Sequence, residues 1–233
     1  MSAIITTENV HKIYRVGENV VHALAGVSIA VESGEFLAIT GTSGSGKSTL
    51  LNVLAGLEPA TSGEIVICNE HIENLTENQL VSFRRENVGF IFQSFNLVAT
   101  MTAAENVALP LTFRGEGKRE RLEKARRMLE VVGLADHADH KPLQMSGGQQ
   151  QRVGIARALV VDPKIVFADE PTGNLDSHNG ADVMNLIKGI VTESGLSVVM
   201  VTHDLTLARK ADRLIHLIDG RVVENENNVQ SKI

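Results

Sequence analysis

The chain has 233 residues, of which 43% are hydrophobic and 21% charged, and its formal net charge is −6. This composition is typical of one globular domain, and the acidic balance disfavours a nucleic-acid partner, because proteins that bind nucleic acids more often carry excess positive charge. Residues 1–11 lack the features of a signal peptide and no apolar run reaches the roughly 18–20 residues of a membrane span, so we expect a soluble chain whose membrane spans, if it needs any, come from another protein.

The first third of the chain shows the alternation of apolar and polar residues that predicts β-strands. One apolar run, residues 35–40, is interpreted as a buried strand that leads directly into a glycine-rich loop and then a helix. Cys68, the only cysteine, ends another apolar run, which predicts a buried side chain and excludes an internal disulfide. Besides the strand at 35–40, the elements predicted here are strands at 4–14, 23–31 and 64–68, a helix at 48–57 and turns at 32–34 and 62–63.

The middle of the chain is predicted to be helical. Apolar residues recur at helical spacing over residues 118–132, and Gly133 suits the end of a helix. Residues 118–127 include six basic and two acidic side chains, which indicates a solvated helix face, with a nucleic-acid patch as the weaker alternative.

Two later apolar runs, residues 164–168 and 197–202, are typical of buried parallel strands, because each is rich in β-branched residues and ends in polar ones. Their alternation with helices favours an α/β core with a helical insertion. The polar tail at residues 224–233 is expected to fray.

A glycine-rich sequence after the first buried strand matches the phosphate-binding pattern G-x-x-x-x-G-K-[ST] in full. Glycines let backbone N–H groups point at phosphate oxygens, and the helix that begins near Lys47 adds its positive end. Lys47 would contact the β- and γ-phosphates, and Ser48 would offer its hydroxyl to Mg²⁺. The alternative, a surface turn rich in Gly and Ser, is disfavoured by the strand-to-helix context. The predicted nucleotide-binding residues of this loop are Gly41, Ser43, Gly44, Ser45, Gly46, Lys47, Ser48 and Thr49.

Two carboxylates follow the apolar run at 164–168. In a P-loop enzyme the first of them, Asp169, would hold Mg²⁺ directly or through water, and Glu170 would act as general base on the attacking water. His203 ends the next apolar run, where a contact with the γ-phosphate is wanted, so we assign it a catalytic role. The alternatives are a solvated acidic turn and a structural histidine.

The sequence Leu143-Gln-Met-Ser-Gly-Gly-Gln-Gln-Gln-Arg152 resembles the signature of ABC ATPases, usually written L-S-G-G-Q, with Met145 where Leu is usual. Ser146 suits the N-cap of the helix that follows, and the two glycines would let a phosphate approach its positive end. An ordinary capped helix is the alternative. The residues predicted to bind nucleotide through this segment are Ser146, Gly147, Gly148 and Gln149.

The resemblance to ABC ATPases covers nearly the whole chain and implies further roles. Tyr14 is similar to the aromatic residue that stacks on adenine in this family, although a core strand residue is the alternative. Gln93 resembles the glutamine that contacts Mg²⁺ and the catalytic water, so we expect it to be both a metal ligand and a catalytic residue. The sequence at 174–176 resembles the D-loop of the family but departs from its commonest form, S-A-L-D.

The implied fold is α/β: a P-loop NTPase (RecA-like) core with an N-terminal antiparallel β-subdomain and an inserted helical subdomain at approximately residues 94–160. All 233 residues would then form a single ABC ATPase domain with a polar tail at 224–233. The family mechanism implies a head-to-tail homodimer that closes on ATP and Mg²⁺ and reopens after hydrolysis. Each γ-phosphate would lie between Lys47 and His203 of one chain and Ser146 and Gly148 of the other.

Residues 92–97, 105–111 and 168–176 resemble the branch of ABC ATPases that serves lipoprotein-release, macrolide-export and antimicrobial-peptide-resistance systems. This resemblance implies a membrane permease as partner and a location at the cytoplasmic face of the inner membrane. Phe95, Leu97 and Met101 are predicted either to line a groove for a permease helix or to be core. The rival functions are an ATP-binding scaffold without turnover, a non-transport ABC ATPase of DNA repair or translation, and a small-molecule kinase.

Overall fold

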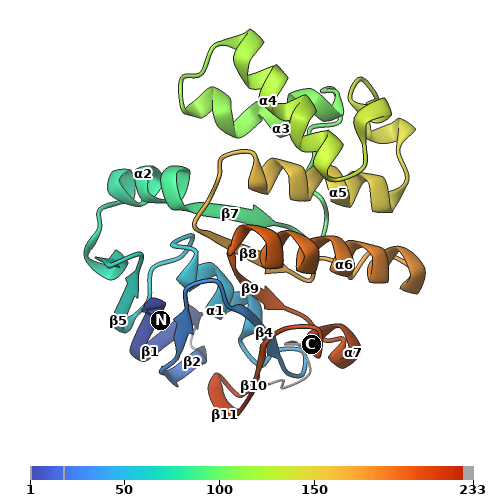
Figure 1. The fold of residues 1–233 in the computed structure, drawn as a ribbon. Helices are drawn as coiled ribbons and strands as arrows, with labels where there is room; N and C mark the ends of the chain where they lie inside the picture. The colour runs from blue at the N-terminus through green and yellow to red at the C-terminus, as the bar shows by residue number, and fades with distance from the viewer. Residues whose placement is uncertain (1, 18, 228–233) are drawn as a thin grey trace.

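Two β-sheets of different kinds organise the chain in the computed structural model, which describes residues 2–17 and 19–227 (Figure 1). The larger sheet has six strands in the order β11-β10-β4-β9-β8-β7, and all its neighbours are parallel except β11 and β10. Parallel order places the carboxyl ends of its strands on one edge. The strands are β4 (Phe36–Thr40), β7 (Val88–Ile91), β8 (Ile165–Asp169), β9 (Ser197–Val201), β10 (Arg213–Ile218) and β11 (Arg221–Asn227).

The smaller sheet is antiparallel and comes mainly from the N-terminal third of the chain. The strand predicted at 23–31 is wrong, because the chain forms two strands there that both pair with β1. The strand predicted to reach Cys68 ends at Ile67, since Cys68 and Asn69 have φ of 52° and 66° and make the turn into β6. The strands are β1 (Ala3–Val16), β2 (Asn19–Val27), β3 (Ala30–Glu32), β5 (Ser62–Ile67) and β6 (Glu70–His71).

Helices cover the larger sheet, and α3, α4 and α5 gather beyond it, at the top of Figure 1. These three helices fall within the insertion predicted at residues 94–160. The helices are α1 (Lys47–Leu54), α2 (Glu77–Asn87), α3 (Ala103–Phe113), α4 (Lys118–Val131), α5 (Gly147–Leu159), α6 (Ser177–Ser194) and α7 (Leu205–Ala208), with short 3₁₀ turns at Ile72–Asn74, Ala135–His137 and Pro142–Gln144. None of them, within the part of the chain that the structure describes, has the length and apolar character of a membrane span.

Two hydrophobic cores lie on opposite sides of the larger sheet. One core joins the smaller sheet and α1 to the buried strands through residues such as Leu50, Phe167 and Val199. The other packs α3, α4, α5 and α6 together through residues such as Val107 and Leu129. Strands buried on both faces need near-continuous apolar sequence, which is why the runs in β8 and β9 were recognisable.

Three of the sequence-based predictions need correction: the end of α1, the fraying of residues 224–227 and the burial of Cys68. Helix α1 ends at Leu54 rather than at residue 57. Residues 224–227 do not fray, because they belong to β11 and pair with β10; the rest of the predicted tail, residues 228–233, lies outside the described residues. Cys68 is half-buried rather than fully buried.

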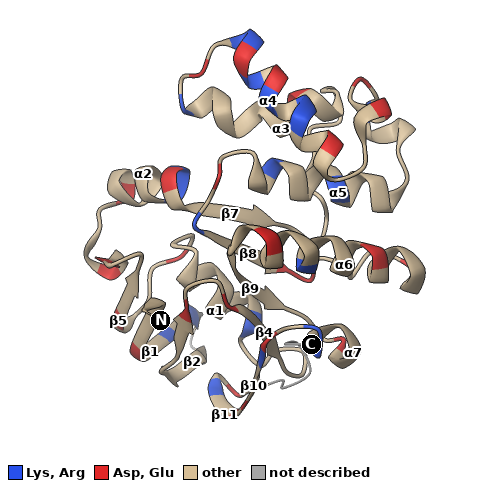
Figure 2. Ribbon diagram, in the orientation of Figure 1, with Lys and Arg blue, Asp and Glu red and all other residues tan. Residues whose placement is uncertain are grey.

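The basic helix α4 has the mixed surface expected of a solvated helix face. Figure 2 shows Lys and Arg alternating with Asp and Glu along it. Three of its cations form ion pairs: Lys124 with Glu116 at 2.9 Å, Arg127 with Glu123 at 2.7 Å, and Arg126 with Asp139 at 2.6 Å.

Candidate functional site

A cavity of about 600 Å³ opens at the edge of the larger sheet where the parallel strands end. Ligands of open α/β sheets bind at this edge, because the loops after neighbouring strands meet there. The chain brings to this cavity the loop after β4, Gln93 after β7, Glu170 after β8 and His203 after β9. The lining residues are Val21, His22, Ala23, Ser43, Gly44, Gly46, Lys47, Ser48, Thr49, Gln93, Glu170, His203 and Asp219.

Two glycines hold the loop after β4 against neighbouring backbone. A Cβ on Gly41 would lie 2.2 Å from the Leu217 carbonyl oxygen, and one on Gly46 would lie 2.2 Å from the Ala23 carbonyl oxygen. Their φ angles of 153° and 99° lie in the region that favours glycine. The loop is therefore fixed between β2 and β10. Ser45 faces inward, with a buried hydroxyl that has no hydrogen-bond partner among the described residues, so its side chain does not line the cavity.

The loop presents positive charge to the cavity. Lys47 is 9% exposed, and its Nζ donates to the carbonyl oxygens of Gly41 at 3.0 Å and Thr42 at 2.9 Å. Helix α1 begins at the same residue, and the N–H groups of a first helical turn lack acceptors within their own helix. An ammonium group and a helix N-terminus at one cavity fit a phosphate chain.

Ser48 and Asp169 bring two oxygen donors together at the cavity. The Ser48 hydroxyl donates to Asp169 Oδ1 at 3.1 Å. Burial raises the pKa of Asp169, and the Glu170 charge adds to this effect, while the Ser48 hydrogen bond and the Lys47 charge oppose it. Hydroxyl and carboxylate oxygens are ligands that Mg²⁺ prefers, and a cation there would favour the ionised form of Asp169.

Glu170 and His203 form a close pair. His203 Nδ1 lies 2.6 Å from Glu170 Oε2, with the carboxylate side chain 15% exposed and the imidazole 69% exposed. Glu170 has φ of 46°, a left-handed conformation unusual for a residue with a side chain. Its backbone N–H donates to the Val201 carbonyl oxygen at 2.9 Å, which ties the turn after β8 to β9. Strain of this kind persists where the surroundings fix it, often at functional sites.

Gln93 joins the turn after β7 to the sequence that resembles a D-loop. Its backbone carbonyl oxygen accepts a hydrogen bond from Asn174 Nδ2 at 3.0 Å. Its side chain lies against Gly173, where an added Cβ would be 2.7 Å from Gln93 Nε2. Gln93 therefore lines the cavity and also lies against Gly173 and Asn174.

Tyr14 does not line the cavity. Its hydroxyl donates to Glu58 Oε2 at 2.5 Å, and Lys12 Nζ lies 5.0 Å from its ring centroid. Burial raises the pKa of Tyr14, the Glu58 hydrogen bond adds to this, and a hydrogen bond to Thr49 opposes it. Thr49 is a lining residue, so the ring lies at the border of the cavity, and its stacking on adenine stays a prediction.

The signature segment, residues 146–149, is a closed capping box that lies outside the cavity. Ser146 Oγ accepts from the Gln149 backbone N–H at 3.3 Å, and Gln149 Oε1 accepts from the Ser146 backbone N–H at 2.8 Å. Ser146 is exposed, and Gly148 is buried against Asn179. None of Ser146, Gly147, Gly148 and Gln149 lines the cavity that holds the other predicted site residues.

A sequence model of the family described as ABC transporter matches residues 24–173. The chain belongs to the ABC transporter family. As a member it is an ATP-binding and ATP-hydrolysing subunit, and the predicted P-loop fold and family are confirmed.

Several ABC transporter proteins are similar to this ATPase over nearly its whole length. It is 47% identical to the uncharacterized ABC transporter ATP-binding protein MJ0796 of Methanocaldococcus jannaschii, over 96% of this chain and 97% of that protein. It is 46% identical to the lipoprotein-releasing system ATP-binding protein LolD of Pseudoalteromonas translucida, over 96% of this chain and 97% of that protein. It is also 46% identical to the macrolide export ATP-binding/permease protein MacB of Aggregatibacter actinomycetemcomitans, over 98% of this chain but 35% of that protein. The predicted branch is thereby confirmed.

A solved structure has the same fold. The dimeric, post-hydrolysis structure of the ATP-binding cassette MJ0796 bound to ADP and Pi superposes with a TM-score of 0.89 at 45% identity, covering 96% of this chain and 98% of that one. That protein is dimeric in a further structure, which also has a TM-score of 0.89.

Two structural residues of this ABC ATPase were missed by the sequence analysis. Asn106 is fully buried, and its side chain bonds the backbone of Val98, Met101 and Thr102. Arg157 donates to the carbonyl oxygens of Asn96 at 2.5 Å and Phe95 at 2.8 Å. The capping box that begins α3, with Thr at 102 and Glu at 105, is readable as a sequence pattern and predicts the start of this helix, but it does not mark Asn106. Nothing in the sequence marks Arg157.

The segment predicted to form a permease groove is partly packed against the helical core. Phe95, Leu97 and Met101 are each half-buried, and Leu97 packs against the cluster formed by α3, α4, α5 and α6. Exposed positions alternate with them in this segment, and one of these, Val98, is 36% exposed.

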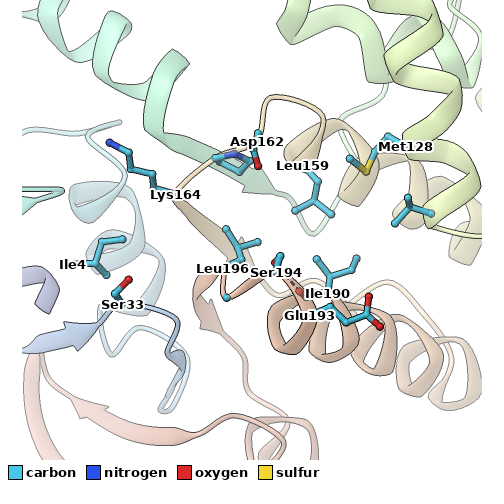
Figure 3. A pocket seen from close by; sticks show the side chains of 13 residues that line it. Ile4, Ser33, Met128, Leu159, Asp162, Lys164, Ile190, Glu193, Ser194 and Leu196 are labelled. Atoms are coloured by element: carbon cyan, nitrogen blue, oxygen red, sulfur yellow. Dashed lines mark hydrogen bonds between the residues drawn. The ribbon is translucent and has the colours of Figure 1, made fainter. Parts of the chain in front are cut away.

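A second cavity, of about 590 Å³, lies where α4, the C-terminal end of α6 and the turn at 162–164 meet. In Figure 3 Met128 and Leu159 lie on one side of it, and Ile4 and Ser33 on the other. None of the predicted site residues lines it, so it is separate from the nucleotide site.

Proposed function

We propose that this ATPase works as a head-to-tail pair of identical chains that closes on two ATP molecules and drives a membrane permease. The observation that carries the proposal is the division of the motifs in one chain. The phosphate loop, Ser48, Gln93, Glu170 and His203 meet at one cavity, whereas the capped N-terminus of α5 lies outside it. A second copy, related by a two-fold axis, would place its signature segment at this cavity. The signature segment of the first chain would lie at the cavity of the second copy in the same way.

Within one chain, each group has a role that its position suits. The loop N–H groups and Lys47 would bind the phosphates, Tyr14 at the border would contact the adenine, and Ser48, Asp169 and Gln93 would hold Mg²⁺. ATP supplies the γ-phosphoryl bond that is broken. Glu170 would take a proton from the attacking water, and His203, held by Glu170 at 2.6 Å, would contact the γ-phosphate.

The partner chain would complete the charge stabilisation. Ser146 and the glycines after it present a helix N-terminus that has no phosphate of its own chain to bind. Placed against the partner's γ-phosphate, it would add preorganised donors to those of Lys47 and His203, and such donors stabilise charge that develops in the transition state.

The permease assignment rests on the branch of the family. LolD is named for lipoprotein release and MacB for macrolide export, and MacB is described as an ATP-binding and permease protein in one chain. We infer that this chain binds a separate permease at the cytoplasmic face of the inner membrane. Part of its contact would come from exposed positions of residues 94–101.

The two-chain mechanism can be tested by mixing variants that are inactive alone. Lys47→Ala removes the phosphate contact in cis, and Ser146→Arg places bulk at the contact in trans. A mixed dimer has one site with both lesions and one with neither, so an equal mixture should regain up to about a quarter of wild-type ATPase activity. Mixing Lys47→Ala with a chain that carries both substitutions leaves no intact site and is the control. Equal activity in the two mixtures would argue against the model, and absence of turnover in the wild type would favour a scaffold.

A further inference from the structure

A short segment before the signature is anchored on the helical subdomain. The backbone N–H of His137 donates to the Leu134 carbonyl oxygen, and its own carbonyl oxygen accepts from the His140 N–H, each at 3.0 Å. The His140 carbonyl oxygen in turn accepts from Ala103 N–H at 2.8 Å, at the first residue of α3. The 3₁₀ turn that carries His137 is therefore held by α3, and it also contacts α4. Its imidazole is half-buried.

The His137 ring reaches the capping box of α5. Its Nε2 lies 3.0 Å from Gln149 Nε2. The other end of this amide is fixed, because the Ser146 backbone N–H can only donate, and the atom 2.8 Å from it is Gln149 Oε1. The Gln149 amide must therefore present its NH₂ group to His137. An NH₂ group donates only, so His137 Nε2 must carry the lone pair, with the ring neutral and its proton on Nδ1.

We propose that neutral His137 is a positioning residue for the signature. By accepting from Gln149 it fixes the amide that closes the capping box with Ser146, and so orients the α5 N-terminus toward the partner's nucleotide. This inference rests on the proposed function, in which Ser146 acts in trans.

Protonation of His137 breaks the arrangement. The imidazolium would direct an N–H at the Gln149 NH₂, so two donors would face each other. Rotation of the amide would repair that contact but would turn its NH₂ toward the Ser146 N–H, and the capping box would open. The arrangement therefore requires a neutral ring, and signature function is expected to weaken when acid protonates His137.

Several titratable and charged groups lie near His137. The His140 ring meets the His137 ring edge-on, with centroids 5.0 Å apart. Asp139 is engaged by Arg126 of α4 at 2.6 Å. The other charged residues on the segment and on the facing turn of α5 are Asp136, Lys141 and Arg152.

The test measures ATP-dependent dimerisation of the Glu170→Gln protein at pH 7.5 and pH 5.5 by sedimentation. With His137 present, the dimer dissociation constant should rise about 10-fold when the pH is lowered from 7.5 to 5.5. This estimate assumes that each of the two signature segments loses one hydrogen bond, which weakens dimerisation about threefold per segment. His137→Gln supplies an amide oxygen that accepts without titrating, and most of this rise should disappear. His140→Gln is the matched control and should keep it. Acid effects that arise at other sites are common to all these proteins and cancel.

A second variant guards against a folding defect in His137→Gln. In Gln149→Glu, one carboxylate oxygen can accept from the Ser146 N–H, and the other can accept from protonated His137. The pH dependence should therefore be lost or inverted, with tighter dimers at pH 5.5.

The outcomes separate the two proposals. An equal rise in the dissociation constant for the His137 and His137→Gln proteins, or an undiminished rise in Gln149→Glu, would overturn the positioning role. Failure of the Glu170→Gln protein to dimerise with ATP at pH 7.5 would overturn the proposed function instead.

Discussion

Adjacent carboxylates at the end of β8 have different partners and therefore different uses. Asp169 is bonded to the Ser48 hydroxyl, and burial raises its pKa. Glu170 is turned by its left-handed backbone to meet His203. A carboxylate beside a hydroxyl suits a cation, whereas one beside an imidazole at the cavity suits a water molecule that must lose a proton.

Glu170→Gln should retain ATP binding but lose about 10²- to 10⁴-fold in turnover, which is the usual contribution of a general base. Steady-state ATPase rates and equilibrium ATP binding measure the two effects separately. Glu193→Gln, at an exposed residue of the second cavity, is the control and should keep the wild-type rate. Near-normal hydrolysis by Glu170→Gln would exclude Glu170 as the base.

The Tyr14 hydroxyl has a role in stability that is separate from any role of its ring. Its hydrogen bond, together with smaller contributions from Asn52 and Lys12, lowers the pKa of Glu58, although burial opposes this. A lowered pKa means that the stabilisation is fully present above the ordinary value of 4.5 and is lost as pH falls through the lowered value.

Tyr14→Phe should therefore lower the free energy of unfolding by about 1 kcal/mol at pH 7, and by less as Glu58 becomes protonated in acid. Urea unfolding at several pH values measures the difference. Because the ring remains, ATP affinity should change little in Tyr14→Phe and fall in Tyr14→Ala. A constant difference in stability down to pH 3 would show that the Glu58 contact is not responsible.

At the scale of elements, the predictable parts were those whose sequence carries its own pattern. β8 and β9 are buried on both faces, so their apolar runs could be read directly, and the polar residues after them gave Asp169, Glu170 and His203. Among the described strands β11 pairs only with β10, and it is mostly exposed, so its polar sequence resembles that of a free tail. The division between β2 and β3 depends on pairing with β1, and no local pattern reports it.

Asn106 shows how an element can depend on one buried polar side chain. Its amide accepts from Val98 N–H at 2.7 Å and donates to the Val98, Met101 and Thr102 carbonyl oxygens. It thereby holds the segment after Gln93 to α3.

Asn106→Leu should cost about 2–4 kcal/mol, because it leaves the Val98 N–H without its acceptor and removes the side-chain donor from the Val98, Met101 and Thr102 carbonyl oxygens. Thermal or urea unfolding measures the loss. Asn185→Ala, at an exposed position where the side chain accepts one bond from Lys210, should change stability by less than about 0.5 kcal/mol. Equal effects of the two substitutions would contradict the structural role given to Asn106.

At the scale of the whole molecule, the chain carries one complete phosphate cavity and one helix N-terminus that the cavity does not use. In a symmetric pair, the helix N-terminus of each chain would lie at the phosphate cavity of the other. Bound ATP would then hold the two chains together, since bound nucleotide stabilises the state that holds it better. The pair should therefore form with ATP and dissociate once ATP is hydrolysed.

Sedimentation of the Glu170→Gln protein tests ATP-dependent pairing, because slow hydrolysis preserves the ATP-bound state. We expect a monomer without nucleotide, a dimer with ATP, and a monomer again when Ser146→Arg is added, although ATP still binds to each chain. A Glu170→Gln protein that binds ATP yet remains monomeric at high concentration would show that ATP does not join two chains.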